Sequence, residues 1–248
     1  MQHRHETEII MSFSNTVALV TGANRGIGRA FVEELLAAGA VKVYAAARNP
    51  EGLSDLVETG QGRVVAVALD VTKPDQIAAA AANKDVNLLI NNAGFVSFAP
   101  LVGIDSIDGA RDEMETNYFG VLNMVRAFAP VLAANGGGAI VNLGSIVSLA
   151  SIPSIGSYSA SKAALHSLTQ GIRGELAGQG THVAGVYPGP VDTDMAATVD
   201  MEKTSPREIA WAVLAGVMAG EEDIYPDPMS LDTHSALLAD PKKVEKQF

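Results

Sequence analysis

Short β-rich runs alternate with longer helical patterns along most of the chain, and this alternation restricts the possible folds more than any other feature. Such an order is typical of a mostly parallel sheet whose connecting helices cover both faces. We expect strands at 16–20, 41–46, 64–69, 86–90, 139–143, 182–187 and, as a short last strand, 224–225. We expect helices at 29–38, 50–58, 74–82, 105–134, 158–177 and 206–219, followed by a polar tail to residue 248. The sequence therefore predicts an α/β fold with one doubly wound, mostly parallel sheet.

Composition limits the class of protein and its partners. The 248 residues, 48% of them hydrophobic, suffice for one domain with a large core, which we place at 14–248 behind a leader at 1–13. A formal net charge of −11 disfavours nucleic acid and anionic membranes as partners. The chain has no Cys, and its His residues are scattered without ligand spacing, so we predict no metal site. No apolar run approaches the roughly 18 residues of a membrane span. We expect a soluble, cytoplasmic protein.

A glycine-rich turn separates the first strand from the first helix. Gly22, Gly26 and Gly28 have the spacing G-x-x-x-G-x-G. Glycines at this place let the backbone turn tightly and approach a pyrophosphate, while the helix N-terminus supplies free N–H groups. A doubly wound sheet binds its ligands outside the carboxyl ends of its strands, where the other polar motifs of the chain also fall. This strand–turn–helix unit predicts a dinucleotide site.

A second group of polar residues follows the fifth strand. Ser145 comes at the exit of that strand, Tyr158 follows it, and Lys162 stands four residues after Tyr158 on a predicted helix. Helical spacing puts the Tyr and the Lys on one face, where an ammonium lowers the pKa of a phenol by favouring its charged form. A Ser hydroxyl beside them can bind the same substrate oxygen. The three residue types suit proton transfer to or from a carbonyl or alcohol oxygen.

Four motifs in register resemble those of the short-chain dehydrogenase/reductase family. They are T-G-A-N-R-G-I-G at 21–28, N-N-A-G at 91–94, the Ser145, Tyr158 and Lys162 set, and P-G-P-V-D-T at 188–193. The resemblance implies a Rossmann-type sheet of about seven strands, a nicotinamide cofactor, and hydride exchange with a carbonyl or alcohol carbon. It also implies a homodimer or homotetramer formed through the predicted helices at 105–134 and 157–177. The chain departs from many family members in lacking their glycine-rich C-terminal segment.

The resemblance assigns roles to single positions. Tyr158 matches the general acid/base, Ser145 the oxygen-binding hydroxyl, Lys162 the residue that lowers the Tyr pKa, and Asn117 the residue that positions a water behind the Lys. Asp70 matches the carboxylate at the adenine. The cofactor residues implied in this way are Gly22, Asn24, Arg25, Gly26, Ile27, Gly28, Arg48, Asp70, Val71, Asn91, Ala93, Gly94, Tyr158, Lys162, Pro188, Gly189, Val191 and Thr193.

The choice between the two nicotinamide cofactors follows from the end of the second strand. An enzyme for NAD places a carboxylate there, on the ribose 2′-hydroxyl. Here Ala47 occupies that position, Arg48 follows it, and no Asp or Glu occurs from residue 42 to 50. Arg25 lies inside the glycine turn. Two guanidinium groups suit a 2′-phosphate, so the sequence predicts NADP(H).

The segments that form substrate pockets in this family are uncharged here and mostly apolar. The candidate pocket residues are Val96, Phe98, Ile146, Leu149, Ile155 and Met195. Such a lining fits a hydrophobic ketone or aldehyde, and the sequence therefore predicts an NADPH-dependent carbonyl reductase acting on a small molecule. Three alternatives stay open: an alcohol or hydroxysteroid dehydrogenase working oxidatively, a 3-oxoacyl-carrier-protein reductase, and a non-catalytic protein that senses NADP(H).

Overall fold

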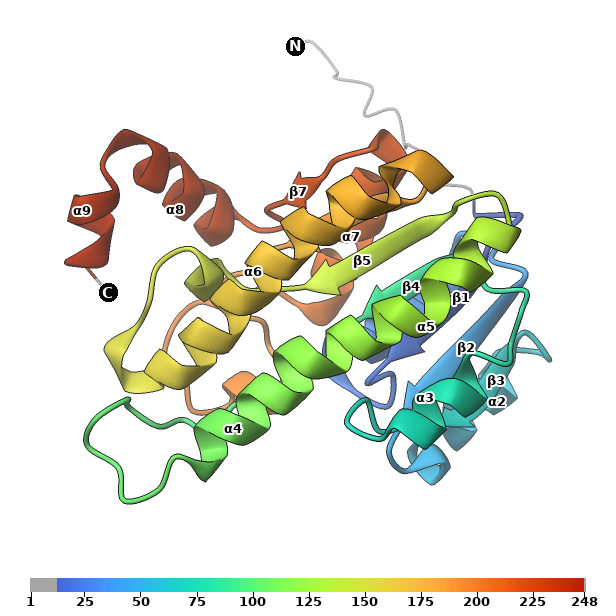
Figure 1. The fold of residues 1–248 in the computed structure, drawn as a ribbon, viewed down its shortest axis with the longest axis horizontal. Coiled ribbons are helices and arrows are strands. Elements are labelled where there is room, and N and C mark those ends of the chain that lie inside the picture. Colours follow the sequence, from blue (N-terminus) through green and yellow to red (C-terminus); the bar gives the residue numbers. More distant parts are fainter. Residues whose placement is uncertain (1–12, 248) are drawn as a thin grey trace, which may run out of the picture.

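The computed structural model describes residues 13–247 and contains one seven-stranded sheet (Figure 1). All neighbouring strands pair in parallel, in the order β3-β2-β1-β4-β5-β6-β7. The strands are β1 Val17–Thr21, β2 Lys42–Ala47, β3 Val64–Ala68, β4 Leu88–Asn91, β5 Ala139–Leu143, β6 His182–Val186 and β7 Asp223–Ile224. The predicted doubly wound α/β fold with a Rossmann-type sheet of seven strands is confirmed.

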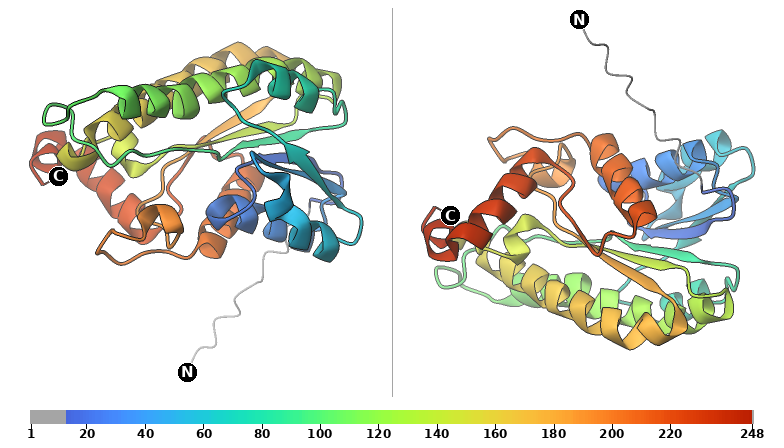
Figure 2. Two further views of the ribbon diagram at one scale, coloured as in Figure 1. Left: turned by 90° about the horizontal axis from the view of Figure 1, so that it is seen from below. Right: turned by 90° about the horizontal axis from the view of Figure 1, so that it is seen from above.

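Helices cover both faces of this sheet, as the two views of Figure 2 show. One layer holds α1 Gly26–Ala37, α2 Ser54–Thr59 and α7 Pro206–Ala219, and the other holds α3 Pro74–Ala80, α5 Val121–Ala134 and α6 Gly156–Leu176. Successive strand residues face opposite layers, so Ala18 and Val20 enter one apolar core and Leu19 enters the other. Because both faces of each central strand are buried, the strands are continuously apolar and could be recognised in the sequence.

The predicted long helix at 105–134 is divided into three parts. It begins as α4 Asp108–Met114, passes through a π-helical turn at Glu115–Gly120, and continues as α5. π-helical turns inside helices are frequently found at functional sites. Asn117 lies in this turn. The loop between β4 and α4, which projects from the lower left of the fold in Figure 1, precedes it.

The prediction that the last helix of the chain lies at 206–219 was wrong. Two helices, α8 Pro228–Ala239 and α9 Pro241–Glu245, follow the last strand. Asp227 caps α8, since its Oδ1 accepts a hydrogen bond from the Ser230 backbone N–H at 2.9 Å, and Pro228 occupies the first helical position. The capping signal was present, but α8 carries polar residues on every side and so lacks the apolar stripe that marks most helices.

The predicted leader lies outside the described residues except for Phe13. The side chain of Phe13 is buried in the core, and its backbone N–H donates to the Ala38 carbonyl oxygen at 2.9 Å. The fold therefore begins at least one residue before the expected position 14. None of the helices described between residues 13 and 247 is long and apolar enough to cross a membrane.

Candidate active site

The strand order brings the predicted motifs to one end of the sheet. The chain leaves β1 toward β2 on one side, and β4 pairs with β1 on the other, so the order reverses between β1 and β4. Ligands of open parallel sheets bind in the crevice that such a reversal opens at the carboxyl ends of the strands. The glycine turn follows β1, residues 92–98 follow β4, and Ser145 follows β5.

The glycine turn has the backbone geometry of a cradle for an anion. Gly22 and Gly26 have φ values of +66° and +54°, a region that favours glycine. A Cβ at Gly28 would lie 2.2 Å from the Gly22 carbonyl oxygen. Arg25 caps α1 without a side-chain hydrogen bond, so the first N–H groups of the helix remain free for a ligand. These observations fit the pyrophosphate of a dinucleotide.

Asn92, which the sequence prediction did not include, braces the glycine turn. Its Nδ2 donates to the carbonyl oxygens of Thr21 at 2.8 Å and of Gly22 at 3.3 Å. Thr21 Oγ1 in turn accepts hydrogen bonds from the backbone N–H groups of Asn92 and Ala93, both at 3.0 Å. The predicted Asn91 instead ends β4 with its side chain inside the sheet, 2% exposed and donating to Asn142 Oδ1 at 2.9 Å. The predicted contact of Asn91 with the cofactor stays a prediction, and it would have to be made by the Asn91 backbone.

The candidate adenine end lies where β2 and β3 finish. Arg48 is exposed directly after β2, and its positive charge reaches Asp70. Burial raises the pKa of the Asp70 carboxyl, but hydrogen bonds from the Thr72 backbone and hydroxyl outweigh it and hold that pKa below its usual value. The carboxylate of Asp70 is therefore fixed near the exposed guanidinium of Arg48.

Arg25 has a partner that the sequence did not suggest. Its Nη1 lies 3.1 Å from Asp194 Oδ2, and both side chains are largely exposed. A Cβ at Gly26 would lie 3.0 Å from Thr193 Cγ2, so the segment after β6 packs directly on the glycine turn. The exposed ion pair with Asp194 contributes little energy, so it would not keep Arg25 from a ligand. The expected convergence of Arg25 with Arg48 stays a prediction.

Asn117 joins the loop after β4 to helix α6. The side chain is fully buried; Oδ1 accepts a hydrogen bond from the Phe95 N–H, and Nδ2 donates to the Phe95 carbonyl oxygen, each at 2.9 Å. Nδ2 also donates to Ser161 Oγ at 2.9 Å, and Ser161 Oγ donates to the Tyr158 carbonyl oxygen at 2.8 Å. The π-helical turn thus fixes the backbone that carries Tyr158.

Asn117 and Lys162 meet at Gly94, and the Tyr158 ring lies near the Lys162 ammonium. Lys162 Nζ lies 5.7 Å from the centroid of the Tyr158 ring and donates to the Leu143 carbonyl oxygen at 2.6 Å. A Cβ at Gly94 would lie 3.4 Å from Asn117 Oδ1 and 3.7 Å from Lys162 Nζ. Lys162 is 4% exposed, and burial lowers the pKa of its ammonium to about 8. Lys162 is therefore close to two other predicted catalytic residues, Asn117 and Tyr158.

The pKa of Tyr158 departs in the direction opposite to the one expected from its Lys neighbour. Burial raises this pKa, and the negative charge of Glu113 raises it further. Both effects disfavour the phenolate. Glu113, on α4, is a buried carboxylate near the site that the sequence prediction missed.

Ser145 lies at the exit of β5, where it caps a short 3₁₀ turn at Ile146–Ser148 that packs against α6. Its Oγ accepts a hydrogen bond from the Val147 N–H at 3.3 Å, and its own N–H donates to Ser148 Oγ at 3.2 Å. This reciprocal pair fixes the backbone of Ser145 at the start of the turn.

The predicted pocket residues differ in exposure. Ile146 is buried, Val96, Leu149 and Ile155 are half-buried, and Phe98 and Met195 are exposed. Four more large apolar side chains of the loop before α4 are exposed, namely Phe95, Leu101, Val102 and Ile107. The loop therefore presents an apolar surface next to Asn117, one of the predicted catalytic residues.

The buried Lys162 makes a pH-dependent contribution to stability that can be measured. Its pKa falls from 10.5 in the unfolded chain to about 8 in the fold, so between these values only the unfolded chain holds the proton. The free energy of unfolding should rise by about 3 kcal/mol across this interval as pH increases. Lys162→Met should lack this rise and be the more stable protein at pH 7. Urea unfolding of both proteins at pH 7 and pH 10 measures these differences; an equal pH dependence in the two proteins would contradict the lowered pKa of Lys162 in the fold.

The chain resembles known proteins over most of its length. The family model described as short chain dehydrogenase matches residues 16–204. A solved short-chain dehydrogenase from Burkholderia cenocepacia, in complex with NADP, is 44% identical with a TM-score of 0.90, covering 96% of this chain and 98% of its own. A short-chain dehydrogenase/reductase from Burkholderia phymatum, in complex with NAD, is 27% identical with a TM-score of 0.80, covering 92% of each chain. The 3-oxoacyl-(acyl-carrier-protein) reductase FabG of Vibrio cholerae is 34% identical over 241 residues, 94% of this chain and 93% of the relative.

Proposed function

The chain belongs to the short-chain dehydrogenase family of oxidoreductases, and on this premise we propose that it is an NADPH-dependent carbonyl reductase for hydrophobic ketones or aldehydes. The observation that carries the proposal is the meeting of Lys162 and Asn117 at Gly94, next to the glycine turn, with the Tyr158 ring 5.7 Å from Lys162 Nζ. A protein that only senses the cofactor would not need a proton donor and a buried ammonium at this place.

Each catalytic side chain has a distinct task in the proposed reduction. NADPH, when bound, supplies the hydride for the carbonyl carbon. The Tyr158 hydroxyl gives its proton to the carbonyl oxygen, while the Ser145 hydroxyl donates a hydrogen bond to the charge that develops there. Lys162, held by the Leu143 carbonyl oxygen, presents its ammonium to the ring and stabilises the phenolate that Tyr158 becomes. Asn117 fixes the backbone of Tyr158 through Ser161.

The Tyr158 phenol is protonated at neutral pH, the form that reduction requires of its proton donor. Burial and the charge of Glu113 raise the pKa of this phenol, so the residue holds its proton at neutral pH. Reduction needs the phenol as proton donor, whereas oxidation of an alcohol needs the phenolate as base. We therefore place the oxidative alternative at alkaline pH.

Preference for NADPH over NADH rests on Arg48. β2 ends without a carboxylate at Ala47, and the exposed guanidinium of Arg48 follows it. Arg48→Asp should raise the KM for NADPH by about 10- to 100-fold, the effect of losing a charge-assisted hydrogen bond to phosphate, and change the KM for NADH far less. Initial rates with each cofactor measure this. Arg111→Asp, the same change of charge on α4, serves as the control; equal effects of Arg48→Asp on both cofactors would contradict the 2′-phosphate assignment.

The relative FabG favours a second candidate, a 3-oxoacyl-carrier-protein reductase. Both candidates reduce a ketone by the same chemistry, so they differ only in the substrate. The net charge of −11 suits an acidic carrier protein poorly, which is why we rank this candidate second. The test is NADPH consumption with a panel of apolar aryl and alkyl ketones beside a 3-oxoacyl thioester, free and on its carrier. Turnover of the free ketones supports the first candidate, and turnover confined to the carrier-bound thioester supports the second.

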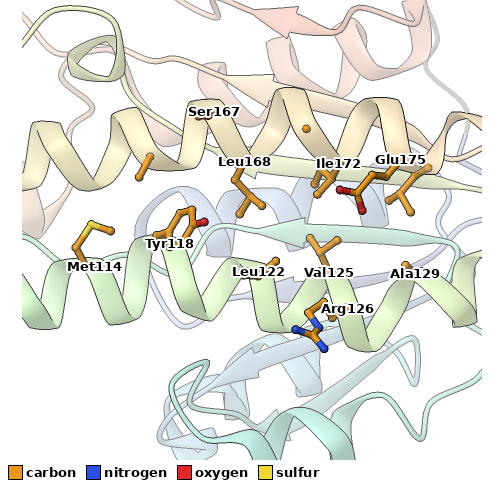
Figure 3. Close-up of a pocket in the computed structure, with 13 residues that line it drawn as sticks. Met114, Tyr118, Leu122, Val125, Arg126, Ala129, Ser167, Leu168, Ile172 and Glu175 are labelled. Carbon is orange, nitrogen blue, oxygen red and sulfur yellow. The ribbon is translucent and has the colours of Figure 1, made fainter.

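We propose a homo-oligomer as the assembly. A groove of about 630 Å³ runs between α5 and α6 (Figure 3), with the small residues Ala129, Ala164 and Gly171 in its lining. Arg126 on α5 and Glu175 on α6 also line it, so a second copy related by a two-fold axis could meet each charge with its opposite. Light scattering should give a mass above 25.7 kDa, reduced by Gly171→Arg. The cytoplasmic location expected from the sequence stays a prediction.

A further inference from the structure

Glu113 is a fully buried carboxylate that the proposed reaction does not use directly. It lies on α4, one helical turn before Asn117, and is 0% exposed. Among the ion pairs described for residues 13–247, none involves Glu113. Its Oε2 is buried without a hydrogen-bond partner in the same part of the chain. Burying a carboxylate without a cation is costly, so this residue is expected to serve a purpose that an apolar side chain would not.

The other oxygen of Glu113 holds the loop that follows β4. Oε1 accepts a hydrogen bond from the Ser97 backbone N–H at 2.7 Å and a second from Ser97 Oγ at 2.8 Å. Gly109, one turn earlier on α4, lets Ser97 come close, since a Cβ there would lie 2.7 Å from Ser97 Cβ. Ser97 thus packs directly against α4, and two charge-assisted hydrogen bonds to Glu113 hold it there.

Glu113 and Asn117 together fix alternate residues of this loop. Asn117 binds both backbone groups of Phe95, and Glu113 binds Ser97 two residues later. The loop then reaches Phe98, whose φ of +54° is uncommon for a bulky residue and persists only where the surroundings enforce it. Phe98 is 49% exposed and belongs to the apolar surface of the loop next to Asn117.

We propose that Glu113 is a positioning residue that fixes the substrate-facing loop at Ser97 and thereby sets the affinity for the carbonyl substrate. This inference rests on the proposed function for its substrate. A loop that is already ordered does not have to be ordered by the substrate, so less of the binding free energy is lost. Because the hydrogen bonds of Glu113 go to Ser97 and not to Tyr158, Lys162 or the glycine turn, the effect should fall on the KM for the carbonyl.

The charge of Glu113 also raises the pKa of Tyr158, and the experiment must distinguish this effect from the hydrogen bonds to Ser97. Two charged groups act on the Tyr158 phenol from the elements packed around it: Lys162 on α6 and Glu113 on α4. The 3₁₀ turn at Ile146–Ser148 carries no titratable side chain, and in the π-helical turn Glu115 is exposed while Tyr118 lines the outer groove. Glu113→Gln and Glu113→Met both remove the charge, but only Gln keeps an acceptor oxygen for Ser97.

Steady-state kinetics with NADPH and an accepted ketone test the proposal. Compared with Glu113→Gln, Glu113→Met should raise the ketone KM by about 10-fold or more, with kcat changed less than about threefold and NADPH affinity unchanged. Ser97→Ala, which keeps the charge and the backbone bond, should raise the same KM by a smaller factor. Equal KM values in the Gln and Met variants would overturn the proposal. If the Met variant does not fold, an unchanged KM in Ser97→Ala overturns it.

A readout without turnover separates this inference from the proposed function. Amide hydrogen exchange should show slow exchange at Ser97 in the wild type and in Glu113→Gln, and fast exchange at Ser97 in Glu113→Met. The Phe95 amide, held by Asn117, should stay slow in all three proteins. Wild-type protein without ketone turnover but with this exchange pattern would contradict the proposed function and leave the loop contact intact. Fast exchange at Ser97 in the wild type would overturn the positioning role whatever the activity.

Discussion

Tyr158→Phe should lower kcat for ketone reduction by about 10²–10⁴-fold, the range in which a positioned proton donor contributes. The substitution removes the transferable proton and almost no volume. The hydroxyl of Tyr158 makes no hydrogen bond within the described residues 13–247, so its loss leaves no protein group unpaired. The affinity for NADPH should therefore change little, since the glycine turn and Lys162 remain in place.

Two measurements on this variant separate chemistry from binding. Absorbance loss of NADPH with a saturating ketone gives kcat, and NADPH fluorescence gives the dissociation constant. Tyr118→Phe is a matched control, because its ring lies in the outer groove between α5 and α6 (Figure 3) and should leave kcat unchanged. A kcat of Tyr158→Phe within tenfold of the wild type would show that another group donates the proton.

Gly28→Ala should abolish measurable NADPH binding and lower the free energy of unfolding by about 1–3 kcal/mol, as overpacking does in buried sites. The added Cβ would lie 2.2 Å from the Gly22 carbonyl oxygen and 2.5 Å from Asn92 Nδ2. Both atoms are held by the turn itself, so the turn must open to admit the methyl group. An open turn no longer presents its N–H groups to the pyrophosphate.

Gly174→Ala is the matched control for this substitution. Gly174 lies within α6, and a Cβ there would meet no atom within 4 Å. The same exchange should therefore raise the free energy of unfolding by about 0.5–1 kcal/mol, because alanine loses less backbone entropy in a helix. Urea unfolding of both variants checks that the free energy of unfolding falls in one and rises in the other, and NADPH titration compares their affinity for the cofactor. Normal NADPH affinity in Gly28→Ala would place the cofactor away from the glycine turn.

The strands were predictable because burial on both faces makes them continuously apolar. β5 was predicted with its observed bounds, and β1, β2 and β6 differ by one residue at one or both ends. β7, with only two residues at the sheet edge, has too little pattern to fix its bounds. α8 was not predicted because no apolar stripe follows its capping residues, although these residues are visible in the sequence.

The site could be predicted as far as spacing and resemblance reach, and no further. Residues on one helix, such as Tyr158 and Lys162, have a separation that the sequence fixes in advance. Contacts between segments distant in sequence depend on the fold. The hydrogen bonds between Asn92 and Thr21 and between Ser97 and Glu113 therefore could not be foreseen. The pKa of Tyr158 was expected to fall because only its Lys neighbour is visible in the sequence; burial and Glu113 are properties of the fold.

Hydride transfer from NADPH can be tested with cofactor labelled with deuterium at C4 of the nicotinamide, in each of the two configurations. The wild type is incubated with an accepted hydrophobic ketone, and the alcohol is analysed by mass spectrometry. We expect one deuterium on the carbinol carbon from one of the two labelled forms, and product formation lowered by about 10²–10⁴-fold with Tyr158→Phe. Alcohol without deuterium from either form, or labelled alcohol formed equally fast by Tyr158→Phe, would contradict hydride transfer with Tyr158 as the proton donor.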